Sequence, residues 1–354
     1  MSQEVPDHNK STNVRQRRRR PPVPLLWRAG LAIGSRVAPA LAGRVAETLF
    51  FTPPRPRPRP STDPLPAGAR HRLVATPAGE VAVWSWGRGP AVYLLHGWGG
   101  RAQQLGALVA PLVDRGFRVV ALDAPGHGAS AGRRSSGPEF ARSLAAVVER
   151  FGPAHAVIAH SLGAAATVFA MREGLAVGRL VFVGPPADPL VWAHRFAAAL
   201  GLTRAAREEL QRQSERRLRA RWADLPLLPV RGLPEPPPLL VVHDRDDREV
   251  PWQDGAAIAA AWPGARRVDT VGLGHQRILR DPAVVQAVAE FVAEAAPTCG
   301  HGRPRAADGC EACALEAELF APDLRRDVTR SEGARAVSAG SPRAARPAAQ
   351  WTVE

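Results

Sequence analysis

Short apolar runs alternate with amphipathic helical patterns along the middle of the chain, from about residue 70 to residue 296. The run AVYLLHG at 91–97 is almost continuously apolar, as expected for a strand that is buried on both faces. Two earlier runs, HRLVATP and VAVWSWG, predict a hairpin of antiparallel strands. Strands that alternate with helices build a mostly parallel sheet covered by helices, so this pattern predicts an open α/β fold.

The same pattern assigns the individual elements. The predicted strands occupy residues 71–77, 81–87, 91–97, 118–125, 154–161, 179–187, 238–244 and 266–272. The predicted helices occupy 105–116, 139–152, a segment starting at Leu162, 255–262 and 282–296. Open α/β sheets bind their ligands beyond the carboxyl ends of the strands, so the residues that follow the strands are the first candidates for chemistry.

Residues 188–238 interrupt the alternation. They contain the segment WAHRFAAALG, the charged helical segment TRAAREELQRQSERRLRARW and the proline-rich LPEPPP. An insertion of this size between two sheet strands predicts a lid above the strand ends. We interpret the charged helix as a solvated face rather than a surface for nucleic acid, because charged helices on a protein surface need no such partner.

The N-terminal part differs from the middle in composition. Residues 1–22 are polar and rich in arginine, which predicts disorder. Residues 25–51 predict one or two short helices, broken near Pro39, which either dock on the following domain or lie on a membrane surface; docking is the favoured interpretation. The repeat PPRPRPRP at 53–60 predicts a stiff linker.

Three parts follow from these shifts in composition. Residues 1–60 form a basic, proline-rich arm with short amphipathic helices, residues 61–297 form the α/β domain with its lid at about 188–238, and residues 298–354 form a cysteine-containing, largely disordered tail. The overall apolar content of 45% and charged content of 23% are ordinary for a protein with a sizeable core.

The net charge of +14 is concentrated in the arm, where 12 Lys and Arg residues stand against three acidic residues in 1–60. This distribution argues against a nucleic-acid surface on the folded body. It leaves weak contact of the arm with an anionic membrane or a nucleic acid as a hypothesis. No specific protein partner follows from the sequence.

The segment at 23–42 follows the basic run Arg17–Arg20 and has the outline of a signal peptide. Arg28 and Arg36 interrupt its apolar core, which leaves runs at or below the roughly 7–15 residues that an exported leader requires. No apolar run reaches the roughly 18 residues of a transmembrane helix. The sequence therefore favours a cytoplasmic protein, with membrane association through the N-terminal helices as the alternative.

The stretch VIAHSLGAAAT places Ser161 between a predicted strand and a predicted helix. A sharp turn that exposes a serine hydroxyl needs small residues two positions before and after it, and Ala159 and Gly163 meet that need. A helix that starts at Leu162 directs its N–H groups at negative charge on an acyl oxygen. A helix N-cap serine is the ordinary alternative.

A nucleophilic serine needs a base, and the base needs an acid that orients it. Two later strand ends supply both: the stretch VVHDRDDREVP carries a cluster of acids, and VGLGHQRIL carries His275. These residues occur in the chain order serine, aspartate, histidine.

Five motifs in order resemble those of the α/β-hydrolase superfamily, in its serine-nucleophile, lid-containing, esterase- and lipase-like branch. HGWGG at 96–100 resembles the oxyanion loop, and LDAPGHGAS at 122–130 resembles the motif after the next parallel strand. AHSLG at 159–163 resembles the nucleophile elbow, DREVP at 247–251 the acid loop, and GH at 274–275 the histidine loop. The resemblance covers about two thirds of the chain and implies an α/β-hydrolase fold.

By this resemblance, Ser161 is the nucleophile, His275 the base and Asp247 the acid that orients it. The backbone N–H groups of Trp98 and Leu162 form the oxyanion hole. Ala159 departs from the glycine that is usual in the elbow and adds one methyl group. No cofactor is required for this chemistry.

Other polar residues near these motifs compete for the same roles. Asp123 and His127 in LDAPGHG are expected to hold a loop together, and His96 and His160 are expected to be structural. Asp244 and Asp246 compete with Asp247, but only Asp247 has the D-x-x-V-P spacing of the acid loop.

The tail contains all three cysteines of the chain within the stretch CGHGRPRAADGCEAC. Cys299, His301, Cys310 and Cys313 are candidate ligands for one structural zinc, because three thiolates and an imidazole complete a tetrahedral site. Free thiols without a shared role, or a redox C-x-x-C, are the alternatives.

The sequence therefore predicts a serine hydrolase, of carboxylesterase type, that cleaves a small-molecule acyl ester through an acyl-enzyme. A thioesterase, an acyltransferase or a C–C hydrolase is an alternative, since the same triad serves all of them. A non-catalytic binding scaffold is the alternative from another class.

Overall fold

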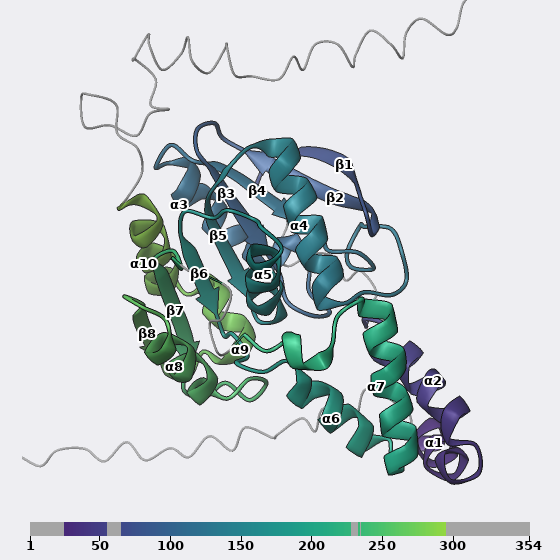
Figure 1. Cartoon of the computed structure of the whole chain (residues 1–354). Helices are drawn as coiled ribbons and strands as arrows, with labels where there is room; N and C mark the ends of the chain where they lie inside the picture. Colours follow the sequence, from purple (N-terminus) through teal and green to yellow (C-terminus); the bar gives the residue numbers. More distant parts are fainter. Residues whose placement is uncertain (1–24, 55–64, 228–232, 234, 295–354) are drawn as a thin grey trace, which may run out of the picture. The chain divides into compact units, whose positions relative to one another are not determined.

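The central element of the computed structural model, which describes residues 25–54, 65–227, 233 and 235–294, is an eight-stranded sheet (Figure 1). Its strand order is β1-β2-β4-β3-β5-β6-β7-β8. The strands are β1 (Arg70–Thr76), β2 (Gly79–Trp86), β3 (Ala91–Leu95), β4 (Arg118–Leu122), β5 (Ala154–His160), β6 (Leu180–Val183), β7 (Leu239–Asp244) and β8 (Arg266–Thr270). β1 and β2 form the predicted antiparallel hairpin, and the six strands from β4 to β8 along the sheet are parallel. The predicted α/β fold is confirmed.

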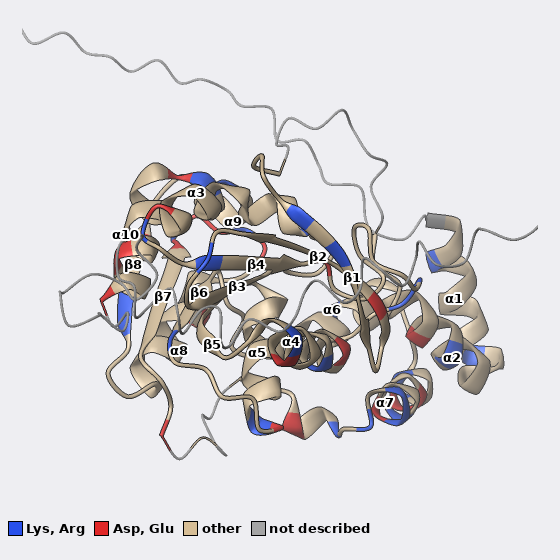
Figure 2. Ribbon diagram, turned by 90° about the horizontal axis from the view of Figure 1, so that it is seen from above, with Lys and Arg blue, Asp and Glu red and all other residues tan. Residues whose placement is uncertain are grey.

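Helices cover both faces of the sheet, as Figure 2 shows from above. The helices are α1 (Leu25–Val37), α2 (Pro39–Phe50), α3 (Val109–Val113), α4 (Gly137–Phe151), α5 (Leu162–Arg172), α6 (Leu190–Ala199), α7 (Arg204–Leu218), α8 (Trp252–Ala261), α9 (Gly274–Arg277) and α10 (Pro282–Ala293). α4, α5 and α8 pack on one face, whereas α3 and α10 pack on the other.

The apolar run in β3 is explained by its position between β4 and β5. All five of its residues are buried. Tyr93 and Leu95 join the core under α4 and α5, whereas Val92 and Leu94 join the core under α3 and α10. Because successive side chains of a strand point to opposite faces, a strand covered on both faces has no position that faces solvent.

The N-terminal helices pack against the insertion between β6 and β7. Ala42 and Ala46 of α2 share a buried cluster with Ala206 and Leu210 of α7. The contact is close, because a Cβ added to Gly43 would lie 2.6 Å from the Cβ of Glu209. The predicted break near Pro39 separates α1 from α2, and the favoured docking of these helices on the body is confirmed.

Two predicted helices differ from the observed ones. Residues 105–116 were expected to form one helix, but a 3-10 helix at Ala102–Leu108 is followed by only five α-helical residues in α3. Gly106 and Pro111 explain the difference, since glycine and proline both weaken a helix interior. α8 begins three residues before the predicted start, at Trp252.

Several predictions fall on segments outside the described residues. These are the proposed disorder of residues 1–22, most of the linker at 53–60, part of the proline-rich end of the insertion, and the candidate zinc ligands Cys299, His301, Cys310 and Cys313. They stay predictions, as does the division into three parts.

Candidate active site

Ser161 lies directly between β5 and α5, in a backbone conformation that residues other than glycine rarely adopt. Its φ is 54° and its ψ is −123°. Among the described non-glycine residues, only Ser161 and Arg219 have a positive φ. Strain of this kind persists where the surrounding structure holds it, and it is found at functional sites such as strand-to-helix turns that expose a serine. A Cβ added to Gly163 would lie 2.8 Å from the carbonyl oxygens of Leu95 and His96, so the turn also requires glycine two residues later.

Two backbone amides lie close to Ser161 in the chain or in space: that of Leu162, the first residue of α5, and that of Trp98, in the loop after β3. A Cβ added to Gly97 would lie 2.7 Å from the Cβ of Ser161, so the loop after β3 runs directly beside the serine. In the described part of the chain, neither the Trp98 N–H nor the Leu162 N–H donates a hydrogen bond. The oxyanion role suggested for these two amides stays a prediction.

The loop that carries Trp98 is held by the motif after β4. The Nε2 atom of His127 accepts a 3.0 Å hydrogen bond from the Gly99 N–H. Asp123 accepts hydrogen bonds of 2.7 Å from the N–H groups of Ala102 and Ala129. Burial raises the pKa of Asp123, against the effect of these donors. Both residues thus have the loop-holding contacts that their sequence motif suggested.

His96 is buried at the start of the same loop and is satisfied as a neutral side chain. Its Nδ1–H donates to the Gly97 carbonyl at 2.7 Å, and its Nε2 accepts from the Ala124 N–H at 2.9 Å. Burial lowers its pKa to about 4. An uncharged histidine with both nitrogens hydrogen-bonded holds the two loops together and does not act as a base at neutral pH.

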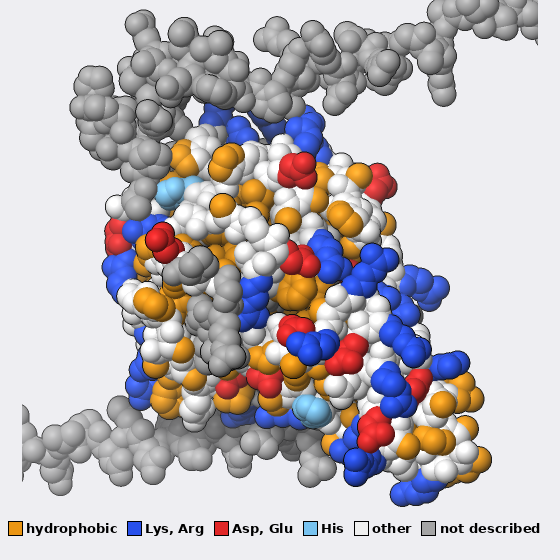
Figure 3. All heavy atoms as spheres, in the orientation of Figure 1, with side chains coloured by type: hydrophobic (Ala, Val, Ile, Leu, Met, Phe, Trp, Pro, Cys, Tyr) orange, Lys and Arg blue, Asp and Glu red, His pale blue; other side chains and the backbone are white. Residues whose placement is uncertain are grey.

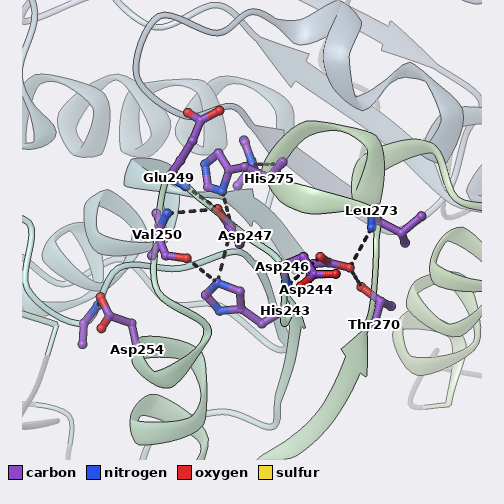
Figure 4. Close-up of polar contacts among 12 residues, drawn as sticks. His243, Asp244, Asp246, Asp247, Glu249, Val250, Asp254, Thr270, Leu273 and His275 are labelled. Atoms are coloured by element: carbon purple, nitrogen blue, oxygen red, sulfur yellow. Dashed lines mark hydrogen bonds and ion pairs between the residues drawn. The ribbon is translucent and has the colours of Figure 1, made fainter. Parts of the chain in front are cut away.

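His275 and Asp247 meet at the strand ends of β8 and β7 (Figure 4). The His275 Nδ1 atom lies 2.6 Å from the Asp247 Oδ2 atom, and both side chains are almost fully buried. The other oxygen, Oδ1, accepts hydrogen bonds from the N–H groups of Glu249 and Val250. Burial alone would raise the pKa of Asp247, but the hydrogen bonds from His243 and His275 outweigh it and hold that pKa well below its ordinary value.

A second histidine contacts the same carboxylate. The Nε2 atom of His243, a fully buried side chain at the end of β7, lies 3.5 Å from Asp247 Oδ2 and 3.2 Å from the Val250 carbonyl oxygen. Gly255 leaves room for this ring, since a Cβ there would lie 2.3 Å from the His243 Nδ1 atom. Sequence reasoning missed His243; the available signal was a histidine four residues before the candidate acid.

The competing acids have other partners. Asp244 accepts hydrogen bonds from the Thr270 hydroxyl at 2.7 Å and from the Leu273 N–H at 3.0 Å, and thus ties β7 to the loop that carries His275. Burial alone would raise the pKa of Asp244, but the hydrogen bonds that it accepts outweigh this effect and lower the pKa. Asp246 is exposed and accepts from the Gly272 N–H. Of the three acids, Asp247 alone is hydrogen-bonded to His275.

His160 connects the elbow to the histidine loop. Its Nε2 lies 3.0 Å from the His275 carbonyl oxygen, and the two rings lie 4.4 Å apart between centroids. Burial and the neighbouring His275 lower the pKa of His160 to about 3. A neutral His160 thus holds the main chain of His275 through this hydrogen bond, which agrees with the structural role expected for it.

Gly184, directly after β6, lies beside the hydrogen-bonded side chains of His275 and Asp247. Its φ is 57°, and a Cβ there would lie 3.0 Å from His275 Nδ1 and 3.4 Å from Asp247 Oδ2. Any side chain at this position would push against both groups. The sequence gave no sign of this contact, because it depends on how three strand ends meet.

The insertion faces the acid loop across a cavity of about 330 Å³. The guanidinium-bearing residues Arg195, Arg245 and Arg248 line it, together with Trp252 at the start of α8. Arg245 pairs with Asp269 outside the cavity. Trp222, an aromatic residue of the insertion, is buried in a cluster with Ala193 and Leu218 and so belongs to the core of the insertion.

The described residues offer neither a metal site nor a membrane span. They contain no group of three or more His, Cys, Asp or Glu side chains placed to hold a metal ion. No helix among them is long and apolar enough to cross a bilayer.

Comparison with protein families places this geometry in a known superfamily. The sequence model of the alpha/beta hydrolase fold family matches residues 90–201, which include the Trp98 loop and Ser161. A second model, described as TAP-like protein, matches residues 221–298, which include Asp247 and His275. The chain is an α/β hydrolase.

Curated relatives of this α/β hydrolase match only part of it. A serine hydrolase-like protein from Homo sapiens is 32% identical over 97 residues, which are 25% of this chain and 47% of that protein. A non-heme haloperoxidase from Rhodococcus erythropolis is 32% identical over 121 residues, which are 32% of this chain and 44% of that protein. The chain thus spans about half the length of these relatives or less.

Solved structures with a similar fold include two esterases. The esterase from Exiguobacterium antarcticum is 17% identical, with a TM-score of 0.48 over 63% of this α/β hydrolase and 99% of that chain. The carboxylesterase CesB from Bacillus subtilis is 18% identical, with a TM-score of 0.49 over 72% of this chain and 98% of that one. Such likenesses concern the fold and carry no information about the substrate.

Proposed function

We propose that this α/β hydrolase is a serine esterase that cleaves a carboxylic ester through an acyl-enzyme formed on Ser161. The observation that carries the proposal is the strained backbone of Ser161 at the end of β5, beside the strand ends that bring His275 and Asp247 to 2.6 Å. Backbone strain clusters at functional sites, and a nucleophilic serine needs a histidine base that is oriented by a third group, which are the groups found here.

In the proposed reaction, His275 acts as the base. Its Nδ1–H donates to Asp247, which leaves Nε2 as the nitrogen that takes the proton of the serine hydroxyl. The serine oxygen forms a bond to the acyl carbon, and His275 returns the proton to the departing alcohol. Water then repeats the sequence and releases the acid. Asp247 stays ionised throughout, since its pKa is held low.

The developing oxyanion would be bound by the free N–H groups of Trp98 and Leu162. The Trp98 amide is fixed by the His127 contact to Gly99, and the Leu162 amide is the first of α5. Because neither amide must leave another partner, both are ready for the charge before it forms. This chemistry needs no metal ion or organic cofactor.

A small-molecule ester with an anionic group is the proposed substrate, because three arginines outnumber the two carboxylates, Asp247 and Glu249, in the cavity beside the acid loop. Arg195 comes from α6 and Arg248 from the loop after β7. Guanidinium groups there would favour a carboxylate or phosphate on the substrate. Thioesters and other acyl donors use the same triad and belong in the same screen.

Two experiments test the proposal. A fluorophosphonate probe should label the folded protein and the Ser85→Ala control, and it should not label Ser161→Ala. A nitrophenyl ester should give burst kinetics when deacylation is slower than acylation. Neutral esters and matched esters with a carboxylate would then test the charge preference, with Arg248→Gln as the variant. Folded protein that is never labelled at Ser161 would favour a non-catalytic binding role.

A further inference from the structure

α1 and the start of α2 expose large apolar side chains on one side. Leu26, Ile33 and Val37 are separated by seven and four residues, which places them on one side of a helix. Figure 3 shows hydrophobic side chains gathered in this region, at the lower right. The outer apolar face consists of Leu26 (86% exposed), Trp27 (58%), Ile33 (65%), Val37 (83%) and Leu41 (63%).

The opposite side of α1 is fixed to the insertion. Leu31 is buried in the cluster formed with α6 and α7. The Arg28 side chain donates a 2.8 Å hydrogen bond to the Ala199 carbonyl, and the Thr203 hydroxyl donates one of 2.9 Å to the Ser35 carbonyl. α1 is therefore packed on one side and apolar on the other. Exposed apolar patches of this kind mark interaction sites.

The two charged side chains of α1 itself, Arg28 and Arg36, are both positive. α1 contains no acidic residue and carries the exposed Arg36 in its last turn, whereas Arg44 of α2 is paired with Glu209 of α7. The acid of α2, Glu47, is buried and paired with Arg134. The sequence before α1 adds the run Arg17–Arg20. Cationic groups beside an apolar helix face complement the head groups of anionic lipids.

A bilayer fits this face better than a second copy of the chain. A symmetric contact between two copies would bring the same arginines together without acidic partners, because the face itself carries none. α1 has 13 residues, or about 20 Å of helix, which is too short to cross a bilayer and suitable for lying in its interface. The surface is also hollowed between Leu26, Trp27 and Gly30.

We propose that the outer apolar face of α1 and α2 docks the protein on membranes that contain anionic lipids. Trp27 and its aliphatic neighbours enter the interface between head groups and acyl chains. The arginines remain at the level of the lipid phosphates. The insertion that packs on α1 then lies next to the membrane surface, and the protein is held there independently of the reaction it performs.

Vesicle sedimentation with the full chain tests the proposal. The protein should sediment with vesicles of phosphatidylcholine containing about one third phosphatidylglycerol, and far less with phosphatidylcholine alone. The triple variant Leu26→Ser, Ile33→Ser, Val37→Ser should bind about tenfold more weakly for each side chain removed. Leu73→Ser with Val271→Ser is the matched control, since both side chains are exposed apolar residues on the sheet part, and it should bind as the wild type does.

Two charge-reversal variants distinguish a contact of the lipid with the arginine on α1 from a general effect of net charge on binding. Arg36→Glu should weaken binding, whereas Arg88→Glu, at an exposed position between β2 and β3 on the sheet part, should not. Binding should fall as salt is raised. The proposal is overturned if wild type ignores anionic vesicles, or if the folded triple variant binds equally well. Binding lost only on removal of residues 1–22 would assign it to that segment, and a wild-type dimer that the triple variant turns into a monomer would assign the face to self-association.

Discussion

The side chain of His160 contacts the main chain of His275: its Nε2 atom lies 3.0 Å from the His275 carbonyl oxygen. The residue before the proposed nucleophile therefore positions the proposed base. Because the carbonyl oxygen can only accept, the contact requires a proton on Nε2, and a neutral His160 has it there.

His160→Phe should keep the buried ring and remove this hydrogen bond. We expect kcat to fall about 10- to 100-fold with a smaller change in KM, because loss of a buried hydrogen bond costs about 1–3 kcal/mol and acts on the position of His275. His155→Phe, a half-buried histidine at the start of β5, is the control. Steady-state kinetics on variants of equal thermal stability would show the difference, and equal kcat values would contradict it.

Asp247→Asn should lower kcat by about 10⁴-fold, the size of loss that this change causes in a serine-protease triad. The amide would hold His275 in the wrong tautomer, with its Nδ1 unprotonated. Asp246→Asn should have little effect, since its exposed side chain bonds only the Gly272 N–H. Turnover of a chromogenic ester by both variants is the measurement. If Asp246→Asn were the damaging change, the assignment of the acid would be wrong.

Gly184→Ala should reduce activity more than about 100-fold. The new methyl group would lie 3.0 Å from His275 Nδ1 and would force the histidine and Asp247 apart. Gly264→Ala is a close control, because Gly264 also has a positive φ, 66°, but no atom lies within 4 Å of its added Cβ. Both variants should lose about 1 kcal/mol of stability through backbone strain. Only Gly184→Ala should lose esterase activity. If the two variants had similar activities, His275 and Asp247 would tolerate this displacement.

Acid should destabilise the protein between about pH 6.5 and pH 4. His96 and His160 have pKa values of about 4 and about 3, below the value of about 6.5 that they have in the unfolded chain. The unfolded state therefore binds more protons in this window, and stability falls as the pH falls. The effect is on the order of 3 kcal/mol for His96 at pH 4. Asp247, whose pKa is also lowered, contributes stability that is lost only at lower pH.

Urea unfolding at several pH values would measure how steeply the free energy of unfolding falls as the pH is lowered. The His160→Phe variant should lose part of the pH dependence between pH 6.5 and pH 4 and keep the loss of stability below that range. A slope unchanged in this variant would mean that His160 is not the neutral, buried group that its contacts indicate.

Much of the fold could be predicted because the parallel strands are covered on both faces. β3 and β7 consist of buried residues throughout, so their sequences are apolar enough to stand out. Ser161 could be placed at a strand end for the same reason. The segment at 105–116 could not be predicted as well, because a short 3-10 helix has no periodic pattern of its own and depends on packing against the sheet.

The contacts of His243 and Gly184 with the proposed triad could not be predicted from the sequence. His243 looks like any residue of a buried strand until β7 and the acid loop are folded, when its Nε2 atom comes to 3.5 Å from Asp247. Gly184 has the same appearance as the glycine of an ordinary turn. Both roles arise from the meeting of strand ends that are far apart in the chain, and a single sequence carries no record of such distances.

The close contact of α2 with α7 has a consequence for how this protein can change over evolutionary time. Gly43 and Glu209 are so near that a side chain at the first position would displace the second. Arg134, in the loop after β4, is tied to Glu47 in the same way. We therefore expect a larger residue at position 43 to be accompanied by a smaller one at position 209, so that these two positions covary across related chains.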